Sequence, residues 1–249
     1  MGLFDLFKSK SKDSGGGERK KSGSAAKWAE AAGSKRAQAY DRQEAIQELS
    51  KLGTADAVEA LLKRFTFQID PSITDQEEKE LAFQGVLTAG KDAIEPVRAF
   101  AAKAESVRWP IRIAKQLLED DELVEELIVW LAKWDTEYAK FIDPKLQLLE
   151  ELGSYTHPDI REAVEPFLQD DSDPARFNAV VATLAQKDPE SLQPLLALLL
   201  DEESVRIRTK ISEGLVQLGW EIPDDQRDPV RKVLPPQFSI DGAGKVTKR

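Results

Sequence analysis

The sequence predicts an all-α fold, an α-solenoid of about six antiparallel helical hairpins. Residues 173–200 have the pattern of two amphipathic helices joined by an Asp-Pro turn. A four-residue string from the second of these helices recurs along the chain. The stretches that precede the copies carry apolar residues at helical spacing. Recurrence at a period of this size indicates stacked supersecondary units.

Each string has two apolar residues three positions apart, which lie on one face of a helix. Polar residues or proline stand between them. The copies begin 36, 30, 40, 28 and 38 residues apart. Proline in a helix interior costs about 3 kcal/mol, so Pro96, Pro166 and Pro194 are expected near a first turn or at a tolerated bend. The six strings are Val58-Glu59-Ala60-Leu61, Ile94-Glu95-Pro96-Val97, Val124-Glu125-Glu126-Leu127, Val164-Glu165-Pro166-Phe167, Leu192-Gln193-Pro194-Leu195 and Val230-Arg231-Lys232-Val233.

The residues around these strings resemble HEAT repeats. The clearest copy is DRQEAIQELSKLG at residues 41–53 followed by DAVEALL at residues 56–62. Further copies follow Asp173-Pro174 and Ser204. The resemblance covers roughly residues 41–234. Over this range the sequence is similar to uncharacterised bacterial HEAT-repeat proteins. This resemblance implies a solenoid and a binding role, but no activity.

The helix boundaries are predicted from capping residues. Gly53 is placed to end the first helix. Thr74, with Glu77 three residues later, predicts an N-cap with a capping box, and Ser106 is expected to cap a later helix. Acids at residues 119–122 suit the positive end of a helix. The helices are expected over residues 41–52, 56–62, 74–88, 93–103, 106–118, 120–133, 160–168, 173–200 as a pair, 204–218 and 224–234.

The chain divides into four regions. Residues 1–24 are expected to form a disordered basic tail with an apolar start, because they offer little to bury. Residues 25–40 form a linker or a capping helix. The repeat array covers residues 41–234. Residues 235–249 are a C-terminal extension, where alternation and a glycine turn predict a short β-hairpin or a loose tail.

The charge distribution limits the classes of partner. Residues 1–40 carry a net charge of +5 and the remainder −15, within a total of −10. An acidic body disfavours duplex nucleic acid, whose binding depends on Lys and Arg. It favours a basic protein partner, or serves solubility alone. The absence of cysteine excludes disulfides and thiolate metal sites and fits a cytoplasmic location. No apolar run approaches the ~20 residues of a membrane span.

Catalytic, cofactor and metal motifs are lacking, so we assign no catalytic residue, cofactor or metal ligand. His157 is the only histidine and is expected in a solvated loop before Pro158. One histidine without cysteine cannot form a usual zinc site. Neither a GxGxxG nor a GxxxxGK[ST] motif is present.

Two inserts supply the candidate binding residues. Residues 65–73 and 134–142 are too long and too apolar for tight turns, and they coincide with the spacings of 36 and 40. Insertions in repeat arrays often emerge on the binding face, and aromatic side chains carry much interface energy. The alternative is that the aromatics cover irregular joints. The partner-binding candidates are Phe65, Phe67, Ile69, Asp70, Trp134, Asp135, Glu137 and Tyr138.

The amino-terminal segment is a second candidate. Leu3, Phe4, Leu6 and Phe7 fall on one side of a short helix, and Lys8, Lys10 and Lys12 follow. Such a segment is expected to dock on a protein or to contact a membrane surface weakly. The alternative is a disordered start with incidental apolar residues.

Taken together, these features favour a non-enzymatic scaffold or adaptor that binds another protein through the solenoid surface. One alternative is an adaptor recruited to membranes by its amino-terminal amphipathic peptide. Another is an enzyme on the same fold, by analogy with HEAT-like lyases or DNA alkylpurine glycosylases. A glycosylase would use Trp109, Trp130, Trp134 and Asp135 in a basic groove, and the acidic body argues against that groove.

Overall fold

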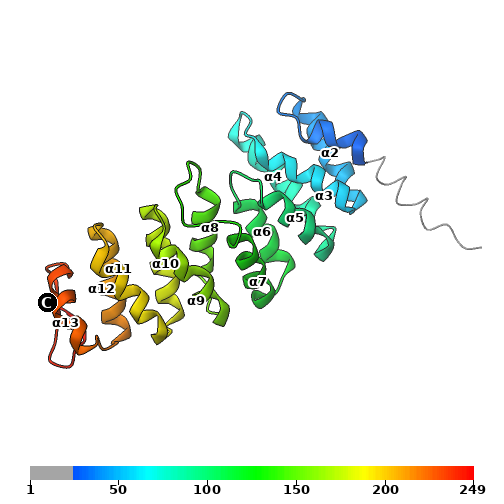
Figure 1. Ribbon diagram of the computed structural model, residues 1–249. Helices are drawn as coiled ribbons and strands as arrows, with labels where there is room; N and C mark the ends of the chain where they lie inside the picture. The colour runs from blue at the N-terminus through cyan, green and yellow to red at the C-terminus, as the bar shows by residue number, and fades with distance from the viewer. Residues whose placement is uncertain (1–24) are drawn as a thin grey trace, which may run out of the picture. The chain divides into compact units, whose positions relative to one another are not determined.

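The computed structural model describes residues 25–249, and most of these residues are helical, as predicted (Figure 1). The predicted tail, residues 1–24, lies outside the described residues, and so do the docking candidates Leu3, Phe4, Leu6 and Phe7. The chain divides into two compact units, Met1–Val97 and Arg98–Arg249.

In the first unit, residues 25–32 form a helix, within the region predicted as a linker or a capping helix, and it ends before Gly33 and Ser34. The elements that follow are α2 (Ala39–Leu52), α3 (Ala55–Leu62), the 3-10 turn η1 (Lys63–Thr66), α4 (Ser72–Leu87), η2 (Gly90–Ala93) and α5 (Ile94–Ala101). The last turn of α5 belongs to the second unit. α2 packs against α3 and α4, and α3 also packs against α4.

The second unit continues with helices that alternate in their packing. Its elements are α6 (Arg108–Leu117), α7 (Asp120–Leu131), α8 (Asp143–Leu152), α9 (Pro158–Val164), η3 (Glu165–Gln169), α10 (Asp173–Gln186), η4 (Pro189–Ser191), α11 (Leu192–Asp201), α12 (Val205–Leu218), α13 (Asp224–Val233), β1 (Phe238–Ile240) and β2 (Val246–Lys248). α10 contacts α8 and α12, while α9 contacts α7 and η3. α11 contacts η3 and α13. Helices two places apart in the chain therefore lie side by side (Figure 1).

All six strings begin on α3, α5, α7, α9, α11 or α13, that is, on every second helix. Of the twelve apolar residues that begin and end these strings, nine are buried, namely Val58, Leu61, Val97, Val124, Leu127, Val164, Phe167, Leu195 and Val230. Pro96 and Pro194 are the third residues of α5 and α11, as expected for a first turn, where a helix has no intrahelical donor to lose. Pro166 lies where α9 continues directly into the 3-10 turn η3, which fits the alternative expectation of a tolerated bend.

Several helix ends follow from local chemistry. Gly53 ends α2 at φ 58°, a left-handed conformation that glycine adopts without strain. Thr54 caps α3 by accepting the N–H of Ala57. None of the helices in the described part of the chain is long and apolar enough to cross a membrane.

Two of the predicted caps are wrong. α4 begins at Ser72, two residues before Thr74, so Thr74 and Glu77 lie inside the helix. The N-cap of α6 is Val107 rather than Ser106. A capping box does form at α7, where Glu119 and Glu122 hydrogen-bond each other's backbone N–H groups. A carboxylate fills that role as well as a hydroxyl does.

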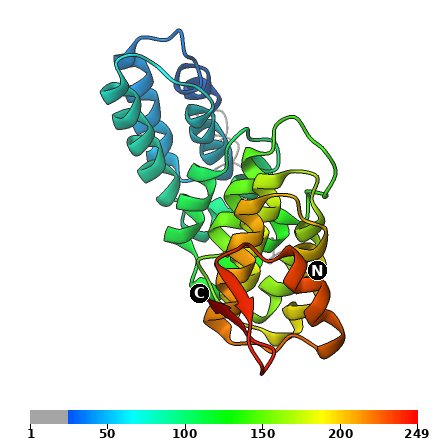
Figure 2. The ribbon, with the colours of Figure 1, turned by 90° about the vertical axis from the view of Figure 1, so that its left-hand side faces the viewer.

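The predicted C-terminal hairpin is confirmed. β1 and β2 pair antiparallel, with Ser239 opposite Thr247. β1 packs against α13 and β2 against α12, and Figure 2 shows the hairpin at the C-terminal end beside these helices. Phe238 and Val246 are buried, which explains why a two-stranded ribbon too small to be stable alone persists here.

Candidate functional site

The first predicted insert folds back onto its own unit. Arg64 holds the loop, because its guanidinium donates to the carbonyl oxygen of Phe67 at 3.1 Å and to Asp75 Oδ1 at 2.8 Å. The guanidinium also lies 4.5 Å from the centroid of the Phe67 ring. The same Asp75 oxygen accepts the N–H of Ile69 at 3.1 Å. Of the four candidates in this insert, three are half-buried, namely Phe65, Phe67 and Ile69, and Asp70 is exposed.

Behind this loop lies a buried carboxylate. Glu78 Oε2 accepts from Arg42 Nε and from Arg64 Nε, both at 2.8 Å. Glu78 Oε1 accepts from Arg42 Nη2 at 3.0 Å. Side-chain exposure is 0% for Glu78 and Arg64 and 4% for Arg42. Because breaking such a network strands an unpaired charge, the network ties the insert to α2 and α4.

Arg64 also acts on the Asp75 carboxyl, together with Lys79. Burial by itself raises its pKa, but hydrogen bonds from Lys79, Arg64 and the Ile69 N–H outweigh that effect. The pKa of Asp75 is therefore lowered from its ordinary value. Its charged form is the one that holds the loop.

The second insert is anchored only at its start. Lys145 Nζ donates to the carbonyl oxygen of Asp135 at 3.1 Å, and the N–H of Asp171 donates to the carbonyl oxygen of Thr136 at 2.9 Å. The candidates Trp134, Asp135, Glu137 and Tyr138 all lie here, with Trp134 half-buried and the two acids exposed.

Beyond the anchors, the aromatic side chains face solvent. Tyr138 is 81% exposed and Phe141 is 74% exposed. Lys140 Nζ lies 5.1 Å from the centroid of the Phe141 ring. Side chains with this exposure contribute little to the stability of the fold. The two inserts thus differ: the first folds back onto its own unit, and the second has exposed aromatic side chains.

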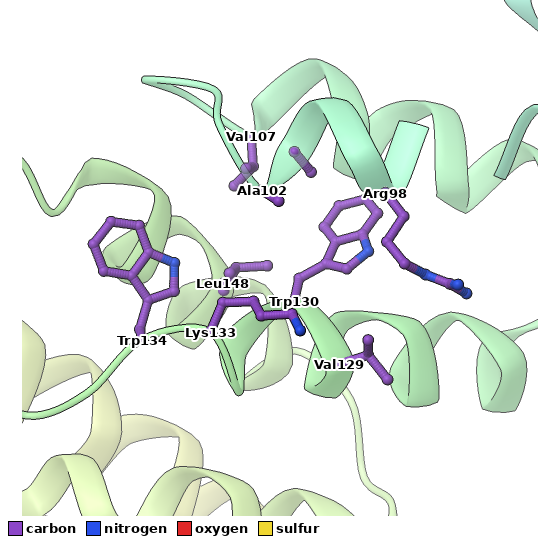
Figure 3. A pocket seen from close by; sticks show the side chains of 9 residues that line it. Arg98, Ala102, Val107, Val129, Trp130, Lys133, Trp134 and Leu148 are labelled. Carbon is purple, nitrogen blue, oxygen red and sulfur yellow. The ribbon is translucent and has the colours of Figure 1, made fainter. Parts of the chain in front are cut away.

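An apolar cavity of about 210 Å³ opens beside the start of this insert. Its lining residues are Arg98, Ala101, Ala102, Val107, Val129, Trp130, Lys133, Trp134 and Leu148. Figure 3 shows the indoles of Trp130 and Trp134 on opposite sides, with Leu148 between them. Val107 and Ala102 close the upper side of that view, and Lys133 extends along the lower side.

One wall of the cavity is held in place by a chain of polar contacts. The Trp130 indole N–H donates to Glu126 Oε1 at 2.5 Å. Arg98 donates to both oxygens of Glu126 at 2.6 Å, a bidentate pair. Trp130 is 5% exposed, so its ring has little freedom to move. By contrast, neither the Lys133 ammonium group nor the Trp134 indole N–H has a hydrogen-bond partner within the described residues.

A second cavity of about 360 Å³ lies on the side of α9 and η3. Trp134 lines it as well, together with Asp135, Thr136 and Phe167. Trp134, at the start of the second insert, therefore lines both cavities. This arrangement brings together two of the predicted candidates, Trp134 and Asp135.

Sequence reasoning missed several residues that build this site. Trp130 and Lys133 lie four and one residue before Trp134. The sequence placed both in the helix predicted over residues 120–133 and named Trp130 only for the glycosylase alternative, without indicating a cavity. Arg98 and Glu126 are 28 residues apart, and no local pattern pairs them. The WLAKW sequence at residues 130–134 is the one signal that could have located the cavity.

The structure confirms the predicted position of His157 just before a helix, but its predicted solvation is wrong. His157 is the N-cap of α9, and its Nδ1 accepts the N–H of Asp159 at 3.2 Å. Its side chain is 16% exposed rather than solvated. In the region that the structure describes, no group of three or more His, Cys, Asp or Glu side chains is placed to hold a metal ion.

Comparison with known proteins does not assign a function, so the function proposed below rests on the residues of this chain. No protein-family model matches the sequence. A search of curated proteins finds no match either.

Proposed function

We propose that this chain is a HEAT-type α-solenoid that serves as a scaffold and binds another protein through the insert between α7 and α8. The solenoid assignment is supported by the six strings on every second helix and by the side-by-side packing of helices two places apart in the second unit. Arrays of this kind present extended surfaces for partners.

The binding role rests on one observation, the exposure of Tyr138 and Phe141 on a loop whose start is anchored. Anchoring lowers the entropy that the loop would lose on binding. Aromatic anchors are the residues whose truncation costs most at interfaces. The exposed Asp135 and Glu137 nearby give the surface a preference for basic partners.

The test is affinity purification followed by mass spectrometry with the wild-type chain and a Tyr138→Ser/Phe141→Ser double variant. The double variant is expected to lose at least tenfold of the specifically captured partner. Its free energy of unfolding should change by less than about 1 kcal/mol, because both side chains are solvated. Tyr40→Ser is the matched control, since Tyr40 is 74% exposed on α2 and lies on neither insert.

Two results would contradict the proposal. One is equal capture by the wild type and the double variant. The other is a loss of capture that Tyr40→Ser reproduces, because the effect would then not be specific to the insert.

A further inference from the structure

The cavity between Trp130 and Trp134 has a charge that is unusual for this chain. Two cations, Arg98 and Lys133, line it and no carboxylate does, although the chain carries a net charge of −10. Arg98 is already paired with Glu126. Lys133 is exposed and is the cation available to a ligand. The chemistry that fits is an apolar group with a carboxylate next to it.

The size of the cavity restricts the ligand further. At about 210 Å³ it is smaller than the roughly 300–1,000 Å³ of sites for cofactors and drug-sized molecules. It suits one or two large apolar side chains of a peptide. Two indole faces and the aliphatic side chains of Val107, Val129 and Leu148 would cover such side chains.

Charges alternate along the chain across Trp134. Lys133 precedes it on the cavity side, and the exposed acids Asp135 and Glu137 follow it. A peptide that lies across Trp134 is therefore favoured when its own sequence has an acidic residue among apolar residues, followed by basic residues. The acidic residue would face Lys133, and the basic residues would face Asp135 and Glu137.

The amino-terminal segment of this chain has that order. Leu3, Phe4, Leu6 and Phe7 flank Asp5, which is the only charged side chain in residues 1–7, and lysines follow at positions 8, 10 and 12. Residues 8–24 join the segment to the first described residue by a tether of about 60 Å when extended. A second copy of the chain can offer the same segment.

We propose that the Trp130–Trp134 cavity binds the amino-terminal segment Met1–Phe7 of this chain. Apolar side chains of the segment fill the cavity, the Asp5 carboxylate pairs with Lys133, and Lys8 and Lys10 lie over Asp135 and Glu137. The cavity is lined by neither Tyr138 nor Phe141, although both proposals use the exposed acids Asp135 and Glu137. The inference does not depend on the partner-binding role proposed above.

The test uses the full-length chain with Phe4→Ser and Phe7→Ser, so that its own segment cannot compete. A fluorescein-labelled peptide of residues 1–12 is titrated and followed by fluorescence anisotropy. Saturable binding is expected, with loss of affinity for a scrambled peptide. Lys133→Glu in the receptor should weaken binding about tenfold. Lys232→Glu is the matched control, an exposed lysine on α13 that lines neither cavity, and it should change affinity less than twofold.

A charge exchange keeps the test independent of folding defects. The peptide with Asp5→Lys should bind the Lys133→Glu receptor more tightly than the unchanged peptide does. Trp134→Ala should reduce affinity more than tenfold. The wild-type chain, whose own segment competes, should bind the labelled peptide at least threefold more weakly than the receptor variant.

Four outcomes would overturn the inference. They are equal binding of the peptide and its scrambled form, no effect of Lys133→Glu, equal affinity of the wild-type chain and the receptor variant, and partition of the peptide into phosphatidylserine vesicles without binding to the protein. The peptide titration contains no other protein. It can therefore fail while partner capture by Tyr138 and Phe141 succeeds, and the reverse also holds.

Discussion

Lys145 and Asp170 form an ion pair shielded from solvent, with side-chain exposures of 1% and 0% and an Nζ–Oδ2 distance of 2.6 Å. Lys145 is on α8, the first helix of its hairpin, and Asp170 follows η3 at the end of the same hairpin. The next hairpin repeats this arrangement, because Arg176 on α10 pairs with Glu202 after α11 at 2.8 Å. In both cases the acid also accepts a backbone N–H two residues ahead, at Ser172 and Ser204. Each pair therefore joins the first helix of a hairpin to the residue that follows its second helix, so the hairpin is held by charge as well as by apolar packing.

Lys145→Met is expected to lower the free energy of unfolding by about 3–5 kcal/mol, because it leaves the Asp170 carboxylate buried without a cation. Urea denaturation measures the loss. The control is Lys115→Met, since the Lys115–Glu151 pair is partly exposed and its loss should cost under about 1 kcal/mol. Similar losses for the two variants would show that burial of the pair does not govern its contribution.

Leu195→Ala is expected to cost about 2–5 kcal/mol, because Leu195 is fully buried in α11 and its removal leaves a cavity. Leu200→Ala on the same helix should cost much less, since Leu200 is 37% exposed. Thermal melts of both variants check the difference. If Leu195→Ala left stability unchanged, the string Leu192-Gln193-Pro194-Leu195 would not mark the buried face of α11.

Gly214→Ala tests the close approach of α12 to α10. A Cβ at Gly214 would lie 2.4 Å from Leu184 Cδ1. Alanine gains about 1 kcal/mol in helix propensity, and overpacking costs about 1–3 kcal/mol, so the net effect should be a small loss of stability. In a Leu184→Ala background the same change should become stabilising. A double-mutant cycle measures this coupling, and additive effects would contradict the clash.

Glu202→Gln tests a dependence of stability on pH. Burial raises the pKa of Glu202, but hydrogen bonds from Arg176 and the Ser204 N–H outweigh it, so the pKa is lowered from its ordinary 4.5. Below 4.5 the unfolded chain takes up the proton more readily than the folded chain, so acid favours unfolding. The stability advantage of the wild type over Glu202→Gln should be full well above pH 4.5. It should shrink as pH falls through the lowered pKa.

Urea denaturation of both proteins at pH 7, 5 and 4 provides the measurement. An advantage of the wild type that stays constant over this range would contradict the lowered pKa. Residual acid sensitivity of the Glu202→Gln variant reports the other carboxylates, Asp75 among them.

The helix order was predictable because its signals are local. Apolar residues at helical spacing and Gly53 act within a few residues of chain, and they placed α2 and α3 almost to the residue. The cap at Thr74 was wrong for a tertiary reason. Asp75 is held by Arg64 and the Ile69 N–H, so the chain enters α4 at Ser72, where a local capping rule has no influence.

The candidate site was predictable only in outline. The length of the second insert and its aromatic residues identified Trp134 and Tyr138, but composition could not separate a loop that covers a joint from one that presents a surface. That difference follows from long-range partners. Arg64 folds the first insert inward, whereas Lys145 and Asp171 hold only the first residues of the second.

The sequence alone therefore determined the helical class, the six-string periodicity, the first-turn prolines and the C-terminal hairpin, because each depends on residues close together in the chain. The tertiary structure alone decided which aromatics face solvent, which cations line a cavity and which carboxylates are buried. Glu78 is enclosed by arginines 36 and 14 residues away, and Glu126, which accepts the Trp130 indole N–H, pairs with Arg98 28 residues away. Burial and ion pairing at such separations depend on how the helices pack, and no short stretch of the sequence determines that packing.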